Sequence, residues 1–162
     1  MTSIILYSSN KKIRYISHVI QEKIGADIVE IKDLNKKTGF FSNLKNNYNA
    51  IRSKNTPIQP ETIDLNVYDL ILIGSPSTFG GISPAISTFI DKNSFKNRNI
   101  IIFTTTNSHT GYDVLNTMKE RIEQKGGNII NTFIMRVNNK DNEQLKINTL
   151  KLIKQLDLDL YA

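Results

Sequence analysis

Short apolar runs recur along the sequence, and the clearest of them, LILI and IIIF, do not alternate with polar residues. The runs are SIILYS (3–8), ADIVEI (26–31), YDLILIG (68–74), NIIIFTT (99–105) and NIINTFIMRV (128–137). A strand with one face in water alternates apolar and polar side chains, whereas a strand covered on both faces reads as a continuous apolar run. These runs therefore predict a parallel sheet with helices on both sides.

Helical patterns lie between most of the apolar runs. An isoleucine stripe at spacings of three and four precedes Gly25, a natural helix stop, and consists of Ile13, Ile16, Ile20 and Ile24. Two further stripes cover residues 115–122 and 145–156, and Ser83-Pro84 begins a shorter helix through Phe89. Five strands alternating with helices predict a doubly wound α/β domain of the flavodoxin-like or Rossmann-like kind. At 162 residues, the chain is expected to form one domain over 1–162.

Composition excludes several classes of function. The chain has no cysteine, which excludes disulfides, thiolate nucleophiles and cysteine-bound metal, and no other metal-ligand cluster is visible. It has no apolar run long enough to span a membrane and no signal-peptide pattern, so we expect a cytoplasmic protein. No paired acid and base that would suit hydrolysis lies near the expected site, so no catalytic residue is assigned.

Positive charge is concentrated in one stretch of the chain. The net charge is +6, and residues 32–54 hold six basic residues against the single acid Asp33. This stretch is either a solvated basic face or a surface for acidic proteins, nucleic acid or anionic lipid. It contains no recognisable nucleic-acid motif, so nucleic acid is not the expected partner.

The carboxyl ends of parallel strands are where an open α/β sheet binds ligands. This rule selects three polar loops, which follow the first, third and fourth strands. The segment 74–86 of the middle loop, GSPSTFGGISPAI, places Phe79 directly before Gly80 and Gly81. An exposed ring there can stack on a flat cofactor, and the glycines can reorient a carbonyl beside it. The alternative is that Phe79 packs into the core and the glycines only turn the chain.

The chain also resembles the flavodoxin family over nearly all its length. The similarity lies in GFFSNLKNNYNAIRSKNTPI (39–58), IDLNVYDLILIGSPSTFGGISPAISTFID (63–91) and FTTTNSHTGYDVLNTMKERIEQKGG (103–127). The resemblance implies a three-layer α/β sandwich whose five-stranded parallel sheet has the order 2-1-3-4-5. It also implies non-covalent binding of FMN and transfer of electrons to protein partners or small acceptors.

By this resemblance, Phe79 lies against the isoalloxazine ring and the backbone of Gly80 or Gly81 faces its N5 atom. The predicted FMN-binding residues of the first loop are Ser8, Ser9, Asn10, Lys11, Lys12 and Ile13. Those of the second loop are Ser75, Pro76, Ser77, Thr78, Phe79, Gly80 and Gly81. Those of the third loop are Thr105, Thr106, Asn107, Ser108, His109, Gly111 and Tyr112. No metal ligand is predicted.

The first loop departs from the family pattern, Ser/Thr-x-Thr-Gly-Asn-Thr. Lys11 stands where glycine is expected, and Ile13 replaces a phosphate-binding hydroxyl. A left-handed backbone at Lys11 would cost roughly 1–2 kcal/mol. A charge-assisted hydrogen bond from Lys11 or Lys12 to a phosphate would contribute roughly 1.5–3 kcal/mol in the other direction. The loop is therefore predicted to hold phosphate by charge and by the α-helix N-terminus, or else to be an ordinary turn with solvated lysines.

Three functions follow from these observations. The first is an FMN electron carrier, rather than an enzyme, whose positive charge favours an acidic redox partner such as a ferredoxin-type protein. The second is an FMN-dependent reductase of a quinone or similar small acceptor, with His109 or Tyr112 as a hydrogen-bond donor. The third is a flavin-free binding domain, which the altered first loop favours.

Overall fold

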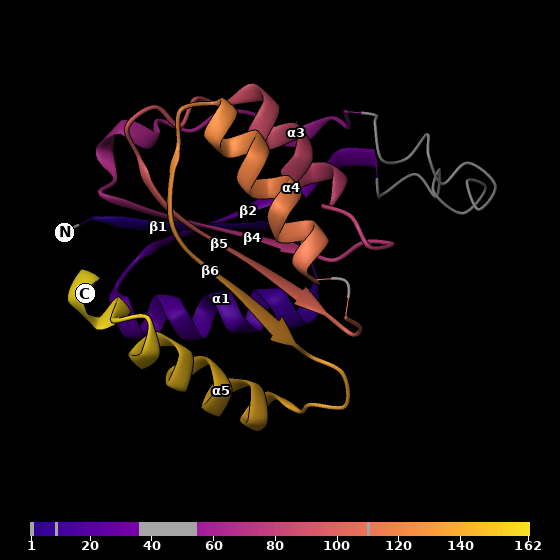
Figure 1. Ribbon diagram of the computed structural model, residues 1–162, viewed down its shortest axis with the longest axis vertical. Coiled ribbons are helices and arrows are strands. Elements are labelled where there is room, and N and C mark those ends of the chain that lie inside the picture. Colours follow the sequence, from indigo (N-terminus) through magenta and orange to yellow (C-terminus); the bar gives the residue numbers. More distant parts are fainter. Residues whose placement is uncertain (1, 9, 36–54, 110) are drawn as a thin grey trace.

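The computed structural model of the protein describes residues 2–8, 10–35, 55–109 and 111–162. Its central sheet has five parallel strands in the order β2-β1-β4-β5-β6 (Figure 1), as the sequence predicts. The strands are β1 (Ser3–Ser8), β2 (Asp27–Asp33), β4 (Leu70–Pro76), β5 (Asn99–Thr106) and β6 (Asn128–Arg136). The predicted strand order 2-1-3-4-5 is therefore confirmed.

A sixth strand extends this sheet beyond the prediction. The two-residue strand β3 (Ile58–Gln59) pairs antiparallel with β2 at the sheet edge, where Lys32 lies opposite Gln59. From the sequence, residues 33–67 are predicted to form one helix and then a long extended return to the next strand, and two residues carry no periodicity that would mark β3. The helix expected between residues 33 and 67 falls largely on 36–54, outside the described residues. A 3-10 turn (Leu65–Val67) leads into β4.

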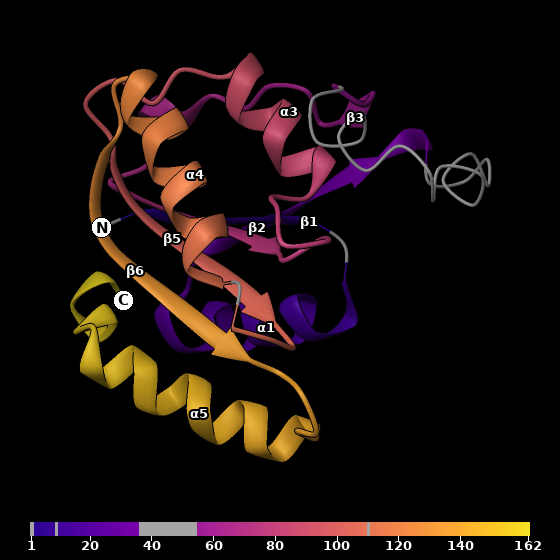
Figure 2. The same ribbon diagram turned by 45° about the vertical axis from the view of Figure 1, so that its right-hand side comes forward.

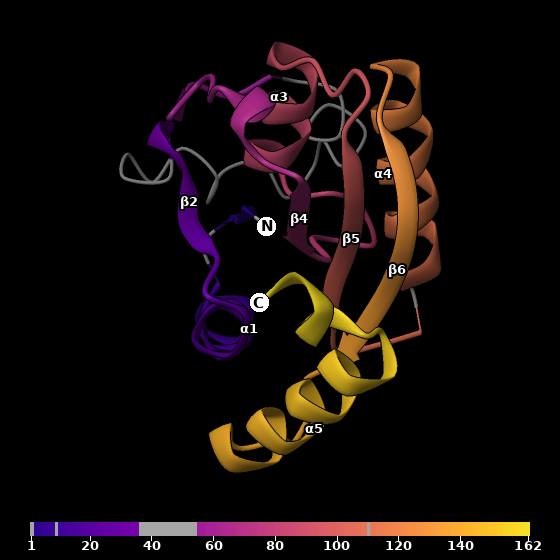
Figure 3. The ribbon, with the colours of Figure 1, turned by 90° about the vertical axis from the view of Figure 1, so that its left-hand side faces the viewer.

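Helices cover both faces of the sheet, which makes a three-layer sandwich. The helices α3 (Pro84–Lys92) and α4 (Gly111–Gln124) lie on one face, and α1 (Lys11–Ile24) and α5 (Asn142–Gln155) lie on the other. Figure 3 shows the same layers after a quarter turn. The strands β2 and β6 lie far apart across the sheet, and α1 and α5 lie below it.

The alternate side chains of each central strand enter two different cores. On β1, Ile4 and Leu6 pack under α3 and α4, whereas Ile5 and Tyr7 pack against α1 and α5. All four side chains are buried. Burial on both faces is the reason why these strands read as unbroken apolar runs in the sequence.

Local signals fix the ends of the helices. Gly25 follows α1 with φ 68, a left-handed backbone that suits glycine. The side chain of Ser83 accepts from the N–H of Ile86 at the start of α3, and Asp141 forms a capping box with Gln144 at the start of α5. The predicted stop at Gly25 and the predicted start at Ser83 are confirmed, although α3 runs three residues beyond Phe89 to Lys92.

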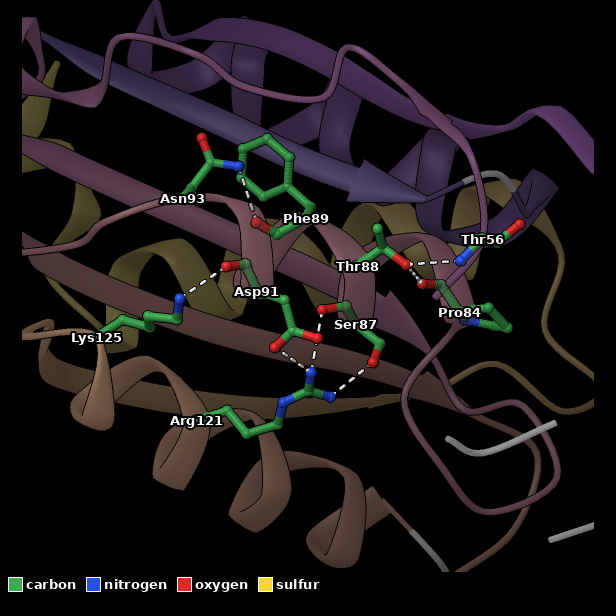
Figure 4. Close-up of polar contacts among 9 residues, drawn as sticks. All are labelled: Thr56, Pro84, Ser87, Thr88, Phe89, Asp91, Asn93, Arg121 and Lys125. Atoms are coloured by element: carbon green, nitrogen blue, oxygen red, sulfur yellow. Dashed lines mark hydrogen bonds and ion pairs between the residues drawn. The ribbon is translucent and has the colours of Figure 1, made fainter. Parts of the chain in front are cut away.

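Polar contacts join α3 to α4 above the sheet (Figure 4). The guanidinium of Arg121 donates to a carboxylate oxygen of Asp91 at 2.6 Å and to the hydroxyl of Ser87 at 2.6 Å. The hydroxyl of Thr88 accepts from the N–H of Thr56 at 3.0 Å, which fixes the chain before β3 against α3. The layer formed by α3 and α4 is therefore held by specific bonds as well as by apolar packing.

Among the described residues, no helix is long and apolar enough to cross a membrane. In the same part of the chain, no three His, Asp or Glu side chains gather as a metal site would require.

Candidate functional site

The three loops selected from the sequence meet at the carboxyl end of the sheet. The start of α1 and the loops after β4 and β5 lie at the same end of the molecule (Figures 1 and 2). The N–H of Ser77 donates to the carbonyl of Thr105 at 2.9 Å, which ties the second loop to the third. The predicted second and third loops also include strand and helix ends: Ser75 and Pro76 close β4, and Gly111 begins α4.

The described part of the first loop leads directly into α1. Lys11 is the first residue of α1, and it is not among the described residues with positive φ. The left-handed backbone considered for Lys11 is therefore wrong, because the chain enters the helix directly after the extended residue Asn10. The side-chain oxygen of Asn10 accepts from the N–H of Lys12 at 2.9 Å and caps the helix. Ser9 lies outside the described residues.

Two other side chains of the first loop face away from a ligand. The ammonium of Lys12 donates to the carbonyl of Lys140 at 2.6 Å, in the segment between β6 and α5. Ile13 is fully buried in the core under the sheet, so its side chain cannot contact a phosphate. Lys11 is exposed. Of the two lysines proposed to neutralise phosphate, Lys11 is thus at the surface and Lys12 is already engaged.

Buried serines connect the first loop to the second. The hydroxyls of Ser8 and Ser83 share a hydrogen bond of 2.6 Å. The hydroxyl of Ser75 accepts from the N–H of Ser83 at 2.9 Å and donates to the carbonyl of Pro76. All three serines are buried. Ser8, Ser75 and Pro76 are predicted to contact FMN; in the structure the hydroxyls of Ser8 and Ser75 are bonded within the protein, and the carbonyl of Pro76 accepts from Ser75.

A tight hairpin turn forms the tip of the second loop. The backbones of Thr78 and Gly81 exchange two hydrogen bonds of 2.9 Å. Between them, Phe79 and Gly80 have φ 49 and φ 75, the pattern of a type I′ turn. The Phe79 side chain is 69% exposed, which excludes the alternative that it packs into the core. A phenylalanine with positive φ is strained by roughly 1–2 kcal/mol.

The third loop combines buried threonines with an exposed polar tip. Thr105 and Thr106 are buried, and the hydroxyl of Thr106 accepts from the N–H of Ser108 at 3.1 Å. Asn107, Ser108 and His109 are exposed. A ligand would therefore meet the exposed tip and only the backbone of the two threonines.

The beginning of α4 completes the third loop. Gly111 is packed so closely on β6 that an added Cβ would lie 3.0 Å from Ile134. Tyr112 follows it and is 67% exposed. A close approach of α4 to the sheet is therefore the structural reason for Gly111, and Tyr112 is a second exposed aromatic beside the loops.

Two residues that the sequence analysis did not select lie beside this site. The guanidinium of Arg136 lies 3.4 Å from Nδ1 of His109, and the carbonyl of Lys140 receives the ammonium of Lys12. Arg136 ends the fifth parallel strand and Lys140 follows it, at a carboxyl end that the same topological rule would have included. Both are cationic, so they increase the positive charge around the loops.

The electrostatics of the three loops suit an anionic ligand. Residues 8–12, 75–83 and 104–112 contain no Asp or Glu, so an anion there meets no like charge within the loops. The N-terminus of α1 favours negative charge. Just before the first loop, burial raises the pKa of the Tyr7 hydroxyl, so this tyrosine is neutral at physiological pH. Of the N–H groups at this helix start, that of Lys12 is already bonded to the side chain of Asn10.

No protein-family model matches the sequence, and no curated protein matches it significantly. Solved structures do match. A presumed flavoprotein from Bacteroides uniformis superposes with a TM-score of 0.74 at 18% identity, over 94% of this chain and 97% of that one. A flavoprotein from Lactobacillus acidophilus in complex with FMN gives 0.66 at 24% identity, over 82% and 92%.

Flavodoxin 1 from Bacillus cereus superposes with a TM-score of 0.55 at 15% identity, over 95% of this chain and 98% of that one. The parallel strand order, the two layers of helices and these structures together define the fold as flavodoxin-like. The fold suggested by the sequence resemblance is confirmed. The residues that would contact FMN stay a prediction.

Proposed function

We propose that this protein binds FMN non-covalently in the three loops and transfers electrons between redox partners. The observation that carries the proposal is Phe79, a strained and exposed aromatic at the carboxyl end of the central strand β4. A positive φ costs energy at a phenylalanine and an exposed ring buries little apolar area, and a ligand that stacks on the ring would account for both features. The Lactobacillus acidophilus flavoprotein, which shares the fold, is in complex with FMN.

The residues present fit the parts of FMN. The phosphate would lie at the N-terminus of α1, beside the exposed Lys11, once Asn10 turns away from the N–H of Lys12. Phe79 would stack on the ring system, with the backbone of Gly80 or Gly81 beside it. The exposed tip of the third loop would meet the polar edge of the ring. Bound FMN supplies the redox chemistry, and the protein orients it and sets the local charge.

The proposed partner is an acidic electron-transfer protein. The chain carries a net charge of +6 and has an isoelectric point near 9.5. Exposed Lys11 and Arg136 add positive charge beside the loops where electrons would leave. Opposite charges speed the encounter of redox partners and make it sensitive to salt.

A reductase of small acceptors is the second candidate. His109 and Tyr112 are both exposed beside the proposed site and can donate a hydrogen bond to a quinone oxygen. Steady turnover of a quinone by the FMN-loaded protein favours this candidate, whereas transfer only to a protein partner favours the carrier.

The decisive experiment is the visible absorption spectrum of purified protein, before and after addition of FMN and removal of the excess. We expect flavin bands that stay with the protein, together with quenched flavin fluorescence from stacking. Phe79→Leu is the matched variant, because it keeps an apolar side chain and removes the ring. A wild-type protein that stays colourless overturns the proposal and favours a flavin-free binding domain.

A further inference from the structure

A concave surface lies at the edge of the sheet and shares only Tyr112 with the three loops. Within the described chain β6 pairs with β5 alone, and α5 runs beside it (Figure 2). The hollow between them has a volume of about 400 Å³. We call it the β6 groove, and six of its lining residues are Tyr112, Ile134, Met135, Arg136, Lys140 and Leu152.

The lining of the β6 groove combines an apolar surface with positive charge. Ile134, Met135 and Leu152 are partly or fully buried and supply the apolar part, and the exposed ring of Tyr112 lies at one end. Arg136 and Lys140 supply two cations. No Asp or Glu lines the groove, and the remaining polar side chains are amides from α5. A ligand with a flat apolar body and a negative group matches all of these features.

Bonds to the rest of the protein hold the Arg136 side chain and the backbone of Lys140. The carbonyl of Lys140 accepts from Lys12 at 2.6 Å, and its N–H donates to the carbonyl of Val137. The guanidinium of Arg136 lies 3.4 Å from Nδ1 of His109. A positioned guanidinium loses less freedom when an anion binds than a mobile side chain would.

We propose that the β6 groove binds a small planar organic anion, an aromatic carboxylate or sulfonate. Its volume falls within the roughly 300–1,000 Å³ typical of small-molecule sites. The apolar body of such a ligand would cover Ile134 and Leu152 beside the Tyr112 ring, and its acid group would pair with Arg136 and Lys140. Of the lining residues, Tyr112 alone was also predicted to contact FMN, so this site can be tested in protein without FMN.

The test is titration of the FMN-free protein with 2-naphthoate and, in parallel, with the neutral 2-naphthamide, followed by amide NMR shifts. We expect saturable binding of the acid, at least about tenfold tighter than the amide, as one charge-assisted hydrogen bond allows. The largest shifts should fall on residues 134–140 and on the facing side of α5. Equal affinity for the two probes, no saturable binding, or shifts confined to the Phe79 turn would overturn the proposal.

Two charge-removing variants and one control sharpen the test. Arg136→Gln and Lys140→Gln should each lower the affinity for 2-naphthoate about tenfold and leave the affinity for 2-naphthamide unchanged. Lys140→Gln keeps the backbone carbonyl that Lys12 uses, so the loop should retain its position. Lys151→Gln removes the same charge from an exposed position on α5 outside the groove, and should change nothing. If both groove variants bind 2-naphthoate as tightly as the wild type, the anion site is contradicted, whether or not the protein binds FMN.

Discussion

The loop after β1 and the loop after β4 border the same site, but they are stabilised in opposite ways. In the first loop, Asn10 caps α1 and Lys12 binds a carbonyl, so groups that suit a phosphate already have partners in the protein. In the second, Phe79 is exposed on a left-handed backbone. The polar groups of the first loop are paired within the protein, whereas the second loop holds a phenylalanine at positive φ with its ring exposed.

This difference divides the proposed binding of FMN into two unequal parts. The aromatic surface of Phe79 is already exposed, whereas the N–H of Lys12 becomes available to a phosphate only when Asn10 gives up its bond. The two loops still depend on each other, because Ser83 bonds to Ser8 in the first and, through its N–H, to Ser75 in the second. Substitutions in each loop test this difference.

Ser83→Ala should have the largest effect, because it removes a bond that joins the two loops. It deletes the α3 cap, worth about 1 kcal/mol, and leaves the buried hydroxyl of Ser8 without this partner, at a cost of roughly 1–3 kcal/mol. We expect a loss of about 2–3 kcal/mol in the free energy of unfolding, measured by urea denaturation.

Two further variants control this result. Ser94→Ala removes an exposed hydroxyl and should cost little. The double variant Ser8→Ala/Ser83→Ala should be less destabilised than the sum of the single changes, because the unpaired hydroxyl is gone. Strict additivity would show that the two serines are not coupled.

Phe79→Asn should separate stability from binding in the second loop. Asparagine tolerates the left-handed backbone of a type I′ turn, so the free protein should gain about 0.5–1 kcal/mol in unfolding free energy. Loss of the ring should lower the affinity for FMN about tenfold. Thermal unfolding and flavin titration measure the two effects. Phe79→Leu, which keeps the strain, should lose affinity without any gain in stability; equal stability of the two variants argues against strain at this turn.

Substitutions at Asn10 test whether its cap competes with phosphate in the first loop. Asn10→Asp should stabilise the free protein by roughly 0.3–1 kcal/mol through the helix dipole, and should weaken FMN by repulsion. Asn10→Ala should destabilise the free protein by about 1 kcal/mol but leave FMN affinity equal or higher, because the N–H of Lys12 is released. If both variants weaken FMN equally, Asn10 contacts the ligand instead of competing with it.

The smallest effect concerns Tyr7, which is buried just before the first loop. Burial is the main cause of its raised pKa, from an ordinary value of 10.0, with Glu30 adding to the rise. Because the folded state holds this proton more tightly, the stability it contributes is present below pH 10 and falls as the pH rises through the folded pKa. Tyr7→Phe should flatten the alkaline loss of stability relative to wild type, measured by urea denaturation at several pH values. Identical slopes for the two proteins would contradict a raised pKa at Tyr7.

The sequence predicted the layout of the site better than the roles of its side chains. The rule for parallel sheets located three loops that do meet, and the exposure of Phe79 agrees with a stacking role. The buried positions of Ser8, Ser75 and Ile13 were not predictable, because the polar or apolar type of a residue beside a strand end does not reveal which way its side chain points. Arg136 and Lys140 were missed because the loop after the fifth strand was not considered.

The amino-acid pattern predicted five parallel strands and the main helices, whereas the strand order was implied by the resemblance to the flavodoxin family. Strands and helices can be predicted in this way because they depend on periodicity and on contacts within a turn, such as Gly25 after α1. The bond between Ser8 and Ser83, separated by 75 residues, and that between Lys12 and Lys140, separated by 128, are seen only in the folded chain. Such pairs form because the sheet topology brings distant strand ends together, and no local pattern records which side chains then meet.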